Sequence, residues 1–162
     1  MKRLFLLLLA AVLFTSCEVE FSPNDNWKEI PVVYCLLDQD EDTTYVRLQR
    51  CFLGEGNQLN YISNRDSIYY PQSAVKVFIE EWALTGGGNV SGTSPKRVFD
   101  FTYSEGIGKE DGDFYSEAAP VYLCRTAGML DTNCLYRLKV VKTATGDTIV
   151  SGETRLLRGE II

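Results

Sequence analysis

After residue 28, apolar and polar residues alternate in short runs that are separated by turn residues. A period of two is typical of a β-strand with one buried and one solvated face. In Tyr45–Phe52, for example, Val46 and Leu48 fall on one face, whereas Arg47 and Gln49 fall on the other. The pattern therefore predicts β-structure for most of the chain.

Seven runs have a strand pattern, and residues that favour turns stand between them. They cover Glu29–Leu37, Tyr45–Phe52, Ala74–Trp82, Arg97–Tyr103, Pro120–Arg125, Leu135–Lys142 and Thr148–Leu156. The first two runs flank an acidic segment, residues 38–42, and we expect them to form a hairpin. Residues 58–62 could form a helical turn, but no run has the period of an amphipathic helix.

Short strands with intervening turns favour an all-β fold, and here an immunoglobulin/fibronectin-III-like antiparallel β-sandwich of about seven strands. The spacing of Leu130, Tyr136, Leu138 and Val140 resembles the tyrosine corner of such domains. In that motif the tyrosine hydroxyl bonds back to the corner that precedes strand F. The alternative is that Tyr136 simply begins an ordinary strand.

The N-terminus has a different pattern, a basic start followed by an uninterrupted apolar run. Lys2 and Arg3 precede the eleven apolar residues Leu4–Phe14. At ~1.5 Å per residue, a helix of this length is far shorter than a ~30 Å hydrocarbon core, so the run predicts a signal peptide. Leu13–Cys17 resembles the lipobox of bacterial lipoproteins, which implies cleavage before Cys17 and lipid on its thiol. The alternative is an ordinary secretory signal with an incidental cysteine.

These features divide the chain into a signal peptide (residues 1–16), a lipidated Cys17 with a polar tether (17–28) and one sandwich domain (29–162). Because Lys2 and Arg3 leave with the signal, 14 of the 16 basic residues remain against 22 acidic ones, a net charge of −8. Such a domain lacks the basic face that nucleic-acid binding needs. It also lacks a polybasic patch for anionic lipid, so we expect membrane contact through Cys17 alone.

Four further cysteines, Cys35, Cys51, Cys124 and Cys134, would meet an oxidising compartment after export. Three pairings exist, and closeness in sequence favours Cys124–Cys134, with Cys35–Cys51 as the companion bridge. The alternative is that some of them stay reduced as small buried apolar residues. The chain has no CxxC motif, so nothing supports a thioredoxin-like redox site.

The chain contains no histidine, which excludes Ser-His-Asp and Cys-His catalysis and histidine-ligated metal sites. Glu80, Glu81 and Asp100 could be imagined as the carboxylates of a glycosidase. With 22 acidic residues in the chain, however, such pairs arise by chance. We therefore expect no enzyme activity, no catalytic residues and no cofactor.

Asp38, Asp40 and Asp42 have the alternate spacing of acidic residues in a calcium loop. Thr43 stands where an EF-hand loop has glycine, and Gln49 stands where it has glutamate. An acidic, solvated hairpin tip is therefore the preferred interpretation, and calcium binding is the weaker one.

Five segments of the mature chain resemble an uncharacterised Bacteroidota outer-membrane lipoprotein family. They are Val32–Asp38 (VVYCLLD), Tyr45–Asn57 (YVRLQRCFLGEGN), Asp66–Pro71 (DSIYYP), Tyr136–Val140 (YRLKV) and Ser151–Leu156 (SGETRL). Its members are often encoded near TonB-dependent receptors and carry an N-terminal immunoglobulin-like β-domain. The resemblance implies that fold and supplies no catalytic residues. Members usually continue beyond this domain, so a chain ending at Ile162 is expected to be either truncated or a single-domain variant.

The combined expectation is a lipid-anchored protein of the cell outer membrane that faces the periplasm or the cell surface. We expect it to be a non-enzymatic binding or accessory module, which the resemblance extends to TonB-dependent uptake. The expected partners are the membrane, through Cys17, and an outer-membrane receptor or another envelope protein. Two alternatives stay open, namely a fimbrial or adhesin subunit and a glycan-binding or glycan-processing lipoprotein.

Overall fold

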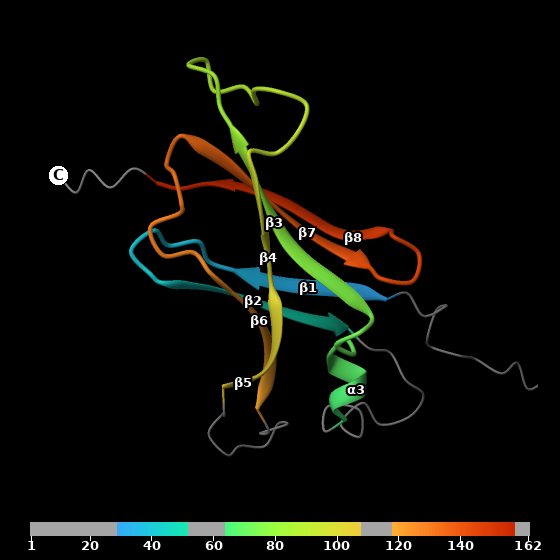
Figure 1. The fold of residues 1–162 in the computed structure, drawn as a ribbon. Coiled ribbons are helices and arrows are strands. Elements are labelled where there is room, and N and C mark those ends of the chain that lie inside the picture. Colours follow the sequence, from blue (N-terminus) through green and yellow to red (C-terminus); the bar gives the residue numbers. More distant parts are fainter. Residues whose placement is uncertain (1–28, 52–63, 108–117, 158–162) are drawn as a thin grey trace, which may run out of the picture.

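Two four-stranded antiparallel sheets form the layers of the domain (Figure 1). The computed structural model describes residues 29–51, 64–107 and 118–157. The signal peptide, Cys17, the tether and the helical turn predicted at residues 58–62 lie outside the described residues. The sheet orders are β1-β2-β6-β5 and β4-β3-β7-β8, so the predicted all-β sandwich is confirmed.

The strands of the two sheets have the order expected of an immunoglobulin-like domain. The first sheet contains β1 (Ile30–Cys35), β2 (Thr43–Cys51), β6 (Ala119–Arg125) and β5 (Thr102–Ile107). The second contains β4 (Arg97–Asp100), β3 (Val75–Ala83), β7 (Cys134–Lys142) and β8 (Thr148–Arg155), and a short helix, α3 (Arg65–Ile68), precedes β3. These orders correspond to strands A-B-E-D and C′-C-F-G, with β7 as strand F and β8 as strand G.

One segment supplies two strands, which is why the described residues form eight strands instead of about seven. The run predicted as a single strand, Arg97–Tyr103, pairs with β3 up to Asp100 and with β6 from Thr102 onward. Phe101 lies between the two parts and is 9% exposed, and its backbone N–H donates to the carbonyl oxygen of Val77 at 3.1 Å. The chain therefore passes from one layer to the other at a single buried aromatic residue.

The core is built from the inward faces of the central strands. Val46 on β2 and Val140 on β7 have no exposed surface, and Val77 and Ile79 on β3 are 1% and 2% exposed. These residues occupy alternate apolar positions, so the period of two correctly identifies the buried face. Burial of aliphatic side chains of this size contributes about 1.5–3 kcal/mol each, an upper estimate.

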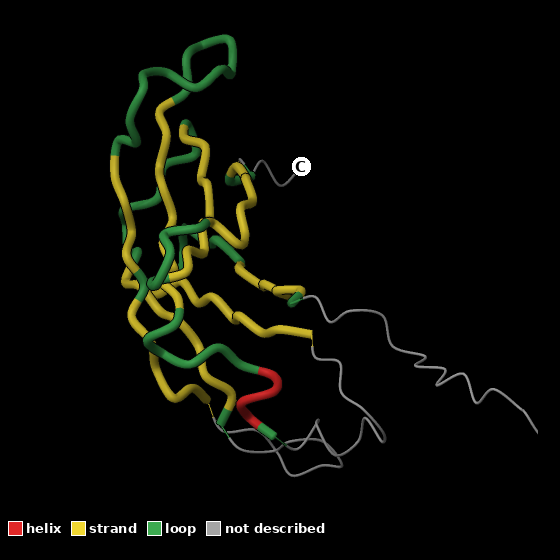
Figure 2. The backbone as a smooth tube through the Cα atoms, turned by 90° about the vertical axis from the view of Figure 1, so that its right-hand side faces the viewer, coloured by secondary structure: helices red, strands yellow, loops and turns green. Residues whose placement is uncertain are grey.

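The two ends of the sandwich differ. The connection between β3 and β4, residues 84–96, projects beyond the strands at the end opposite α3 (Figures 1 and 2).

The strands β1 and β8 are edge strands of different sheets and run in the same direction (Figure 1). Among the described residues, no helix has the length and apolar character needed to cross a membrane.

Candidate functional site

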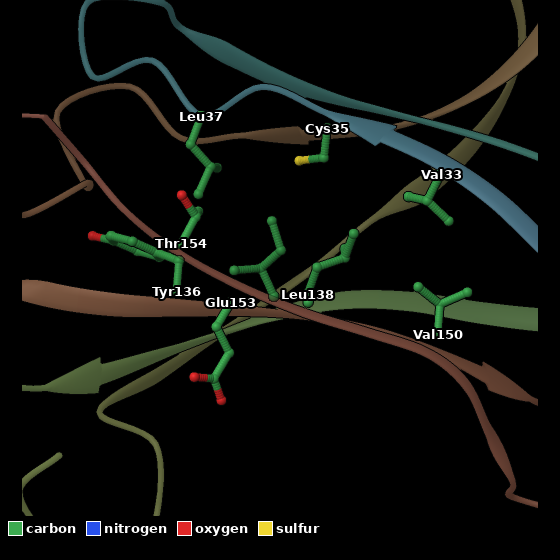
Figure 3. A pocket seen from close by; sticks show the side chains of 10 residues that line it. Val33, Cys35, Leu37, Tyr136, Leu138, Val150, Glu153 and Thr154 are labelled. Carbon is green, nitrogen blue, oxygen red and sulfur yellow. The ribbon is translucent and has the colours of Figure 1, made fainter.

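A cleft of about 230 Å³ opens along one side of the sandwich, where β1 of one sheet faces β8 of the other (Figure 3). Apolar side chains of Val33, Cys35 and Leu37 line the β1 side. The β8 side is lined by Val150, Gly152 and Thr154, and Ile79 and Leu138 lie between the two edges. The cleft is thus an extension of the core that the two edge strands leave uncovered.

Gly152 explains why the cleft is open. The inward positions of β8 are Val150, Gly152 and Thr154, so the strand offers little apolar bulk along its second half. A Cβ atom at Gly152 would meet nothing within 4 Å. Gly152 is not among the positive-φ glycines, so the backbone does not require glycine there. The absence of a side chain at Gly152 therefore leaves space in the cleft, and it is not required by the backbone conformation.

The cleft continues into a second hollow of about 440 Å³ beyond the ends of the two strands. Cys35, Leu37 and Thr154 line both hollows, which together form one elongated groove. Leu36 and Leu157, at this end, are 79% and 91% exposed. Large apolar side chains with this much exposed surface are typical of contact surfaces when they border a hollow.

The acidic loop, residues 38–42, lies at the same end of the groove, and all four of its carboxylates are exposed. Its first turn is held by Asp38, whose Oδ1 accepts a hydrogen bond from the backbone N–H of Asp40 at 2.9 Å. Its last residue is held by the backbone N–H groups of Thr126 and Ala127, which donate to the carbonyl oxygen of Asp42 at 2.9 and 3.1 Å. The negative charge therefore has a defined position relative to the groove.

The calcium interpretation of this loop requires the carboxylates of its three aspartates to converge. Within the described ranges, the carboxylates of Asp38, Asp40 and Asp42 do not converge as a group that could hold a metal ion. One Asp38 oxygen is already used in the turn with the Asp40 amide. Calcium binding thus stays the weaker of the two interpretations, and the carboxylates of the loop are exposed at a hairpin tip.

The potential ligand atoms that do converge belong to Glu81, Asp131 and Cys134, within 4.8 Å of one another. The ammonium group of Lys96 lies among them, 3.2 Å from Glu81 Oε1, 3.4 Å from Asp131 Oδ2 and 3.8 Å from Cys134 Sγ. The hydrogen bond to Glu81 raises the pKa of Lys96, which keeps this side chain charged. The ammonium group of Lys96 therefore occupies the position that a metal ion would need, and the cluster is a structural ion-pair network.

The carboxylates considered for glycoside hydrolysis are also partners of cations. Lys139 Nζ lies 2.8 Å from Glu80 Oε1, and Lys76 Nζ lies 2.9 Å from Asp100 Oδ1. Burial would raise the pKa of Glu80, but hydrogen bonds from Lys139 and Trp82 outweigh it and hold this pKa below its usual range. Glu80 and Glu81 are adjacent on β3 and point to opposite faces, so they cannot act on one substrate bond.

All four described cysteines are free thiols, so the structure contradicts both predicted disulfides. In the β1–β2 hairpin, Cys35 lies opposite Val46 and Cys51 lies opposite Ile30. The two thiols are thus at opposite ends of the hairpin, roughly 17 Å apart at ~3.4 Å per residue, whereas bridged Cα atoms lie within ~7 Å.

The other predicted pair, Cys124 and Cys134, belongs to strands of different sheets, β6 and β7. Burial raises the pKa of Cys134 to about 11, as it does that of Cys35. At neutral pH these two groups are therefore uncharged and act as small apolar side chains.

Tyr136 makes the contact expected of a tyrosine corner. Its hydroxyl accepts a hydrogen bond from the backbone N–H of Asp131 at 2.6 Å and donates to the Asp131 carbonyl oxygen at 3.2 Å. The residue is 1% exposed, and burial raises its pKa to about 12. The hydroxyl of Tyr136, the third residue of β7, thus holds the β6–β7 connection at Asp131, five residues upstream.

Comparison of the chain with protein-family models, with curated proteins and with solved structures gives no significant match. The groove cannot be found from the sequence, because it depends on which strands become edges. The available signal is Gly152 inside a strand pattern, a position that often marks a bulge or a close approach of another chain.

Proposed function

We propose that this protein is a lipid-anchored cell-envelope protein whose sandwich acts as a non-enzymatic binding or accessory module of an outer-membrane system. The groove between β1 and β8 carries this proposal, because it is elongated, is apolar in its main cleft and is bordered by two sheet edges. Surfaces of this kind receive segments of other proteins. The carboxylates Glu80, Glu81 and Asp100 are engaged in ion pairs, which favours recognition over hydrolysis.

The position of the groove suits a protein that is anchored at its N-terminal end. β1 begins at Ile30, which follows the proposed tether, and the acidic loop lies beyond the other end of this strand. A lipid anchor on Cys17 would therefore present the acidic end of the groove away from the membrane. Two or more acyl chains, at about 0.8 kcal/mol per buried CH₂, are needed for stable anchoring.

The anchor is tested by Cys17→Ala in cells that are fed labelled palmitate. We expect an unprocessed, unlabelled precursor and loss of the protein from the outer-membrane fraction. Ser16→Ala is the matched control, because it keeps a small residue before the cysteine and should be processed normally. Cleavage of the Cys17→Ala chain to the mature size, with retention in the membrane, would reject the anchor.

The binding function is tested with a photo-crosslinking amino acid placed at Thr154, which lines the groove. The control position is Ser151, which is exposed on the outer face of the same strand. We expect crosslinks to another envelope protein from residue 154 and none from residue 151. Equal crosslinking from both positions, or none from either, would contradict a binding role for the groove.

A further inference from the structure

Building on the binding function proposed above, we infer that the groove binds an extended segment of a partner protein. Alternate apolar side chains of this segment would enter the cleft, and its Lys or Arg residues would lie against the acidic loop. The inference depends on three properties of the groove, which are its shape, its strand edges and its charge.

The shape of the groove fits an extended chain better than a compact small molecule. The main cleft, at about 230 Å³, is the smaller part of a groove that also includes the hollow of about 440 Å³, so the volume is spread along the strands instead of being gathered in one cavity. It continues lengthwise along both strands into the second hollow. From Val33 to Leu37 it covers about 13 Å, at ~3.3 Å per residue, which equals the length of four residues of an extended peptide. Every second side chain of such a peptide would point into the cleft.

The strands on both sides of the groove have unused backbone edges. Among the described strands, β1 pairs only with β2, and β8 pairs only with β7. An extended segment can hydrogen-bond to such an edge and add a strand to the sheet. Pro31 lacks an N–H group and lies near the start of β1, whereas β8 contains no proline. The longer continuous edge, and hence the favoured site of pairing, is that of β8.

The charge around the groove selects for a basic partner. None of the ion pairs among the described residues involves the four carboxylates of the acidic loop. Arg155 lines the second hollow, but its guanidinium donates to the Gly88 carbonyl oxygen at 2.7 Å. Glu153, at the margin, is paired with Arg137 at 2.7 Å. Arg155 keeps its positive charge, but the four carboxylates of the loop outnumber this one cation, so the loop attracts Lys or Arg and repels an acidic segment.

The test is a selection with the full mature chain, in detergent, against a random peptide library displayed on phage. We expect enriched peptides that alternate apolar and polar residues and carry Lys or Arg at one end. One enriched peptide is then labelled, and its binding is measured by fluorescence anisotropy at low and at high salt. Binding should weaken with salt, because the loop is exposed and is screened by ions.

Two variants with matched controls locate the site. Gly152→Leu places a side chain in the cleft and should weaken binding by about tenfold or more, whereas Ser151→Leu adds the same side chain to the outer face of β8. The double variant Asp38→Asn, Asp40→Asn should weaken binding and reduce its salt dependence, because it removes loop charge. Asp147→Asn removes an acid from the turn at the other end of β8 and should have no effect.

Each outcome decides the matter. Unchanged binding by folded Gly152→Leu or by the double variant, enrichment of acid-flanked peptides, or no enrichment at all would overturn the inference. A dimer of the parent protein that Gly152→Leu dissociates would assign the groove to a second copy of this chain and also overturn it. Crosslinking from residue 154 to an envelope protein, without peptide enrichment, would retain the proposed binding function but reject an extended basic segment as the ligand. Failure of lipid attachment to Cys17 would reject the anchor alone.

Discussion

Lys96 Nζ lies 3.2 Å from Oε1 of Glu81, a glutamate whose side chain has no exposed surface. Glu81 follows Val77 and Ile79 on the inward face of β3, so a carboxylate occupies a position at which the alternation predicts a buried apolar residue. The backbone N–H of Lys96 also donates to the Glu81 carbonyl oxygen at 2.7 Å. The pair therefore closes one end of the core and joins β3 to the start of β4.

We expect Lys96→Met to lower the free energy of unfolding clearly, because it leaves the buried carboxylate with Arg97 as its remaining cation. The double variant Glu81→Leu, Lys96→Met should recover most of this loss, since no buried charge then remains. Urea unfolding at neutral pH measures both effects. Lys76→Met is the control, because its ion pair with Asp100 is exposed and contributes about 0–1 kcal/mol. A Lys96→Met protein as stable as the Lys76→Met control would contradict the role of the pair.

Tyr136→Phe should destabilise the domain by about 1–3 kcal/mol, because it removes both hydrogen bonds to the Asp131 backbone while keeping the ring. The Tyr122 hydroxyl is buried and has no hydrogen-bond partner among the described residues. Tyr122→Phe, the matched control, should therefore be neutral or stabilising. Thermal unfolding of the two variants gives the comparison. Equal losses from the two substitutions would show that the corner hydrogen bonds do not stabilise the domain.

Native alkylation should distinguish the cysteines by their surroundings. Cys51 is exposed and should react first with iodoacetamide at pH 8. Cys35 and Cys134, with pKa values raised to about 11 by burial, should react slowly until urea unfolds the chain. Peptide mapping by mass spectrometry gives the order. Recovery of Cys124–Cys134 or Cys35–Cys51 as a crosslinked peptide from the unreduced protein would contradict the free thiols of the structure.

The stability of the domain should fall in acid. The hydrogen bond from Lys142 lowers the pKa of Glu29 below its ordinary value of 4.5, and the backbone N–H of Asn133 lowers that of Asp131 below 3.8. A lowered folded-state pKa stabilises the fold above the unfolded-state value, and this contribution is lost as pH falls through the folded-state value. The loss should therefore begin near pH 4.5 and continue below it.

Lys142→Met tests this dependence, because it removes the first cause of the Glu29 shift. Urea midpoints measured between about pH 3 and 6 should vary less with pH in this variant than in the parent protein. Lys76→Met, on the outer face of the sheet, should keep the parent slope. If the parent and Lys142→Met curves are parallel, the Glu29–Lys142 pair does not contribute to acid sensitivity.

Local pattern was enough to predict most of the fold. The alternation in β2 and β3 marks Val46, Val77 and Ile79 as core residues, and all three are buried. The crossing at Phe101 could not be predicted, because Phe99 and Phe101 continue one period of two across it. What changes at this point is the partner strand, from β3 to β6, and pairing partners are not encoded in the period.

The candidate site was much less predictable than the fold. Closeness in sequence suggested a Cys35–Cys51 bridge, but the hairpin register places the two residues at opposite ends. The groove joins β1 and β8, which are more than one hundred residues apart in the chain, and it exists because neither strand is covered. Such a surface depends on sheet order, which local periodicity does not determine.

The shared direction of β1 and β8 has a mechanical consequence. Ile30 at the start of β1 and Leu157 after β8 lie at opposite ends of the domain, so tension between them acts along both strands (Figure 1). Ladder hydrogen bonds are perpendicular to the strands, so this force loads them in shear. The six residue pairs of β1–β2 and the seven of β7–β8 would then resist together instead of separating one at a time. A domain pulled between these two ends would therefore resist the force through both strand pairs at once, and its ladder hydrogen bonds would not break in sequence.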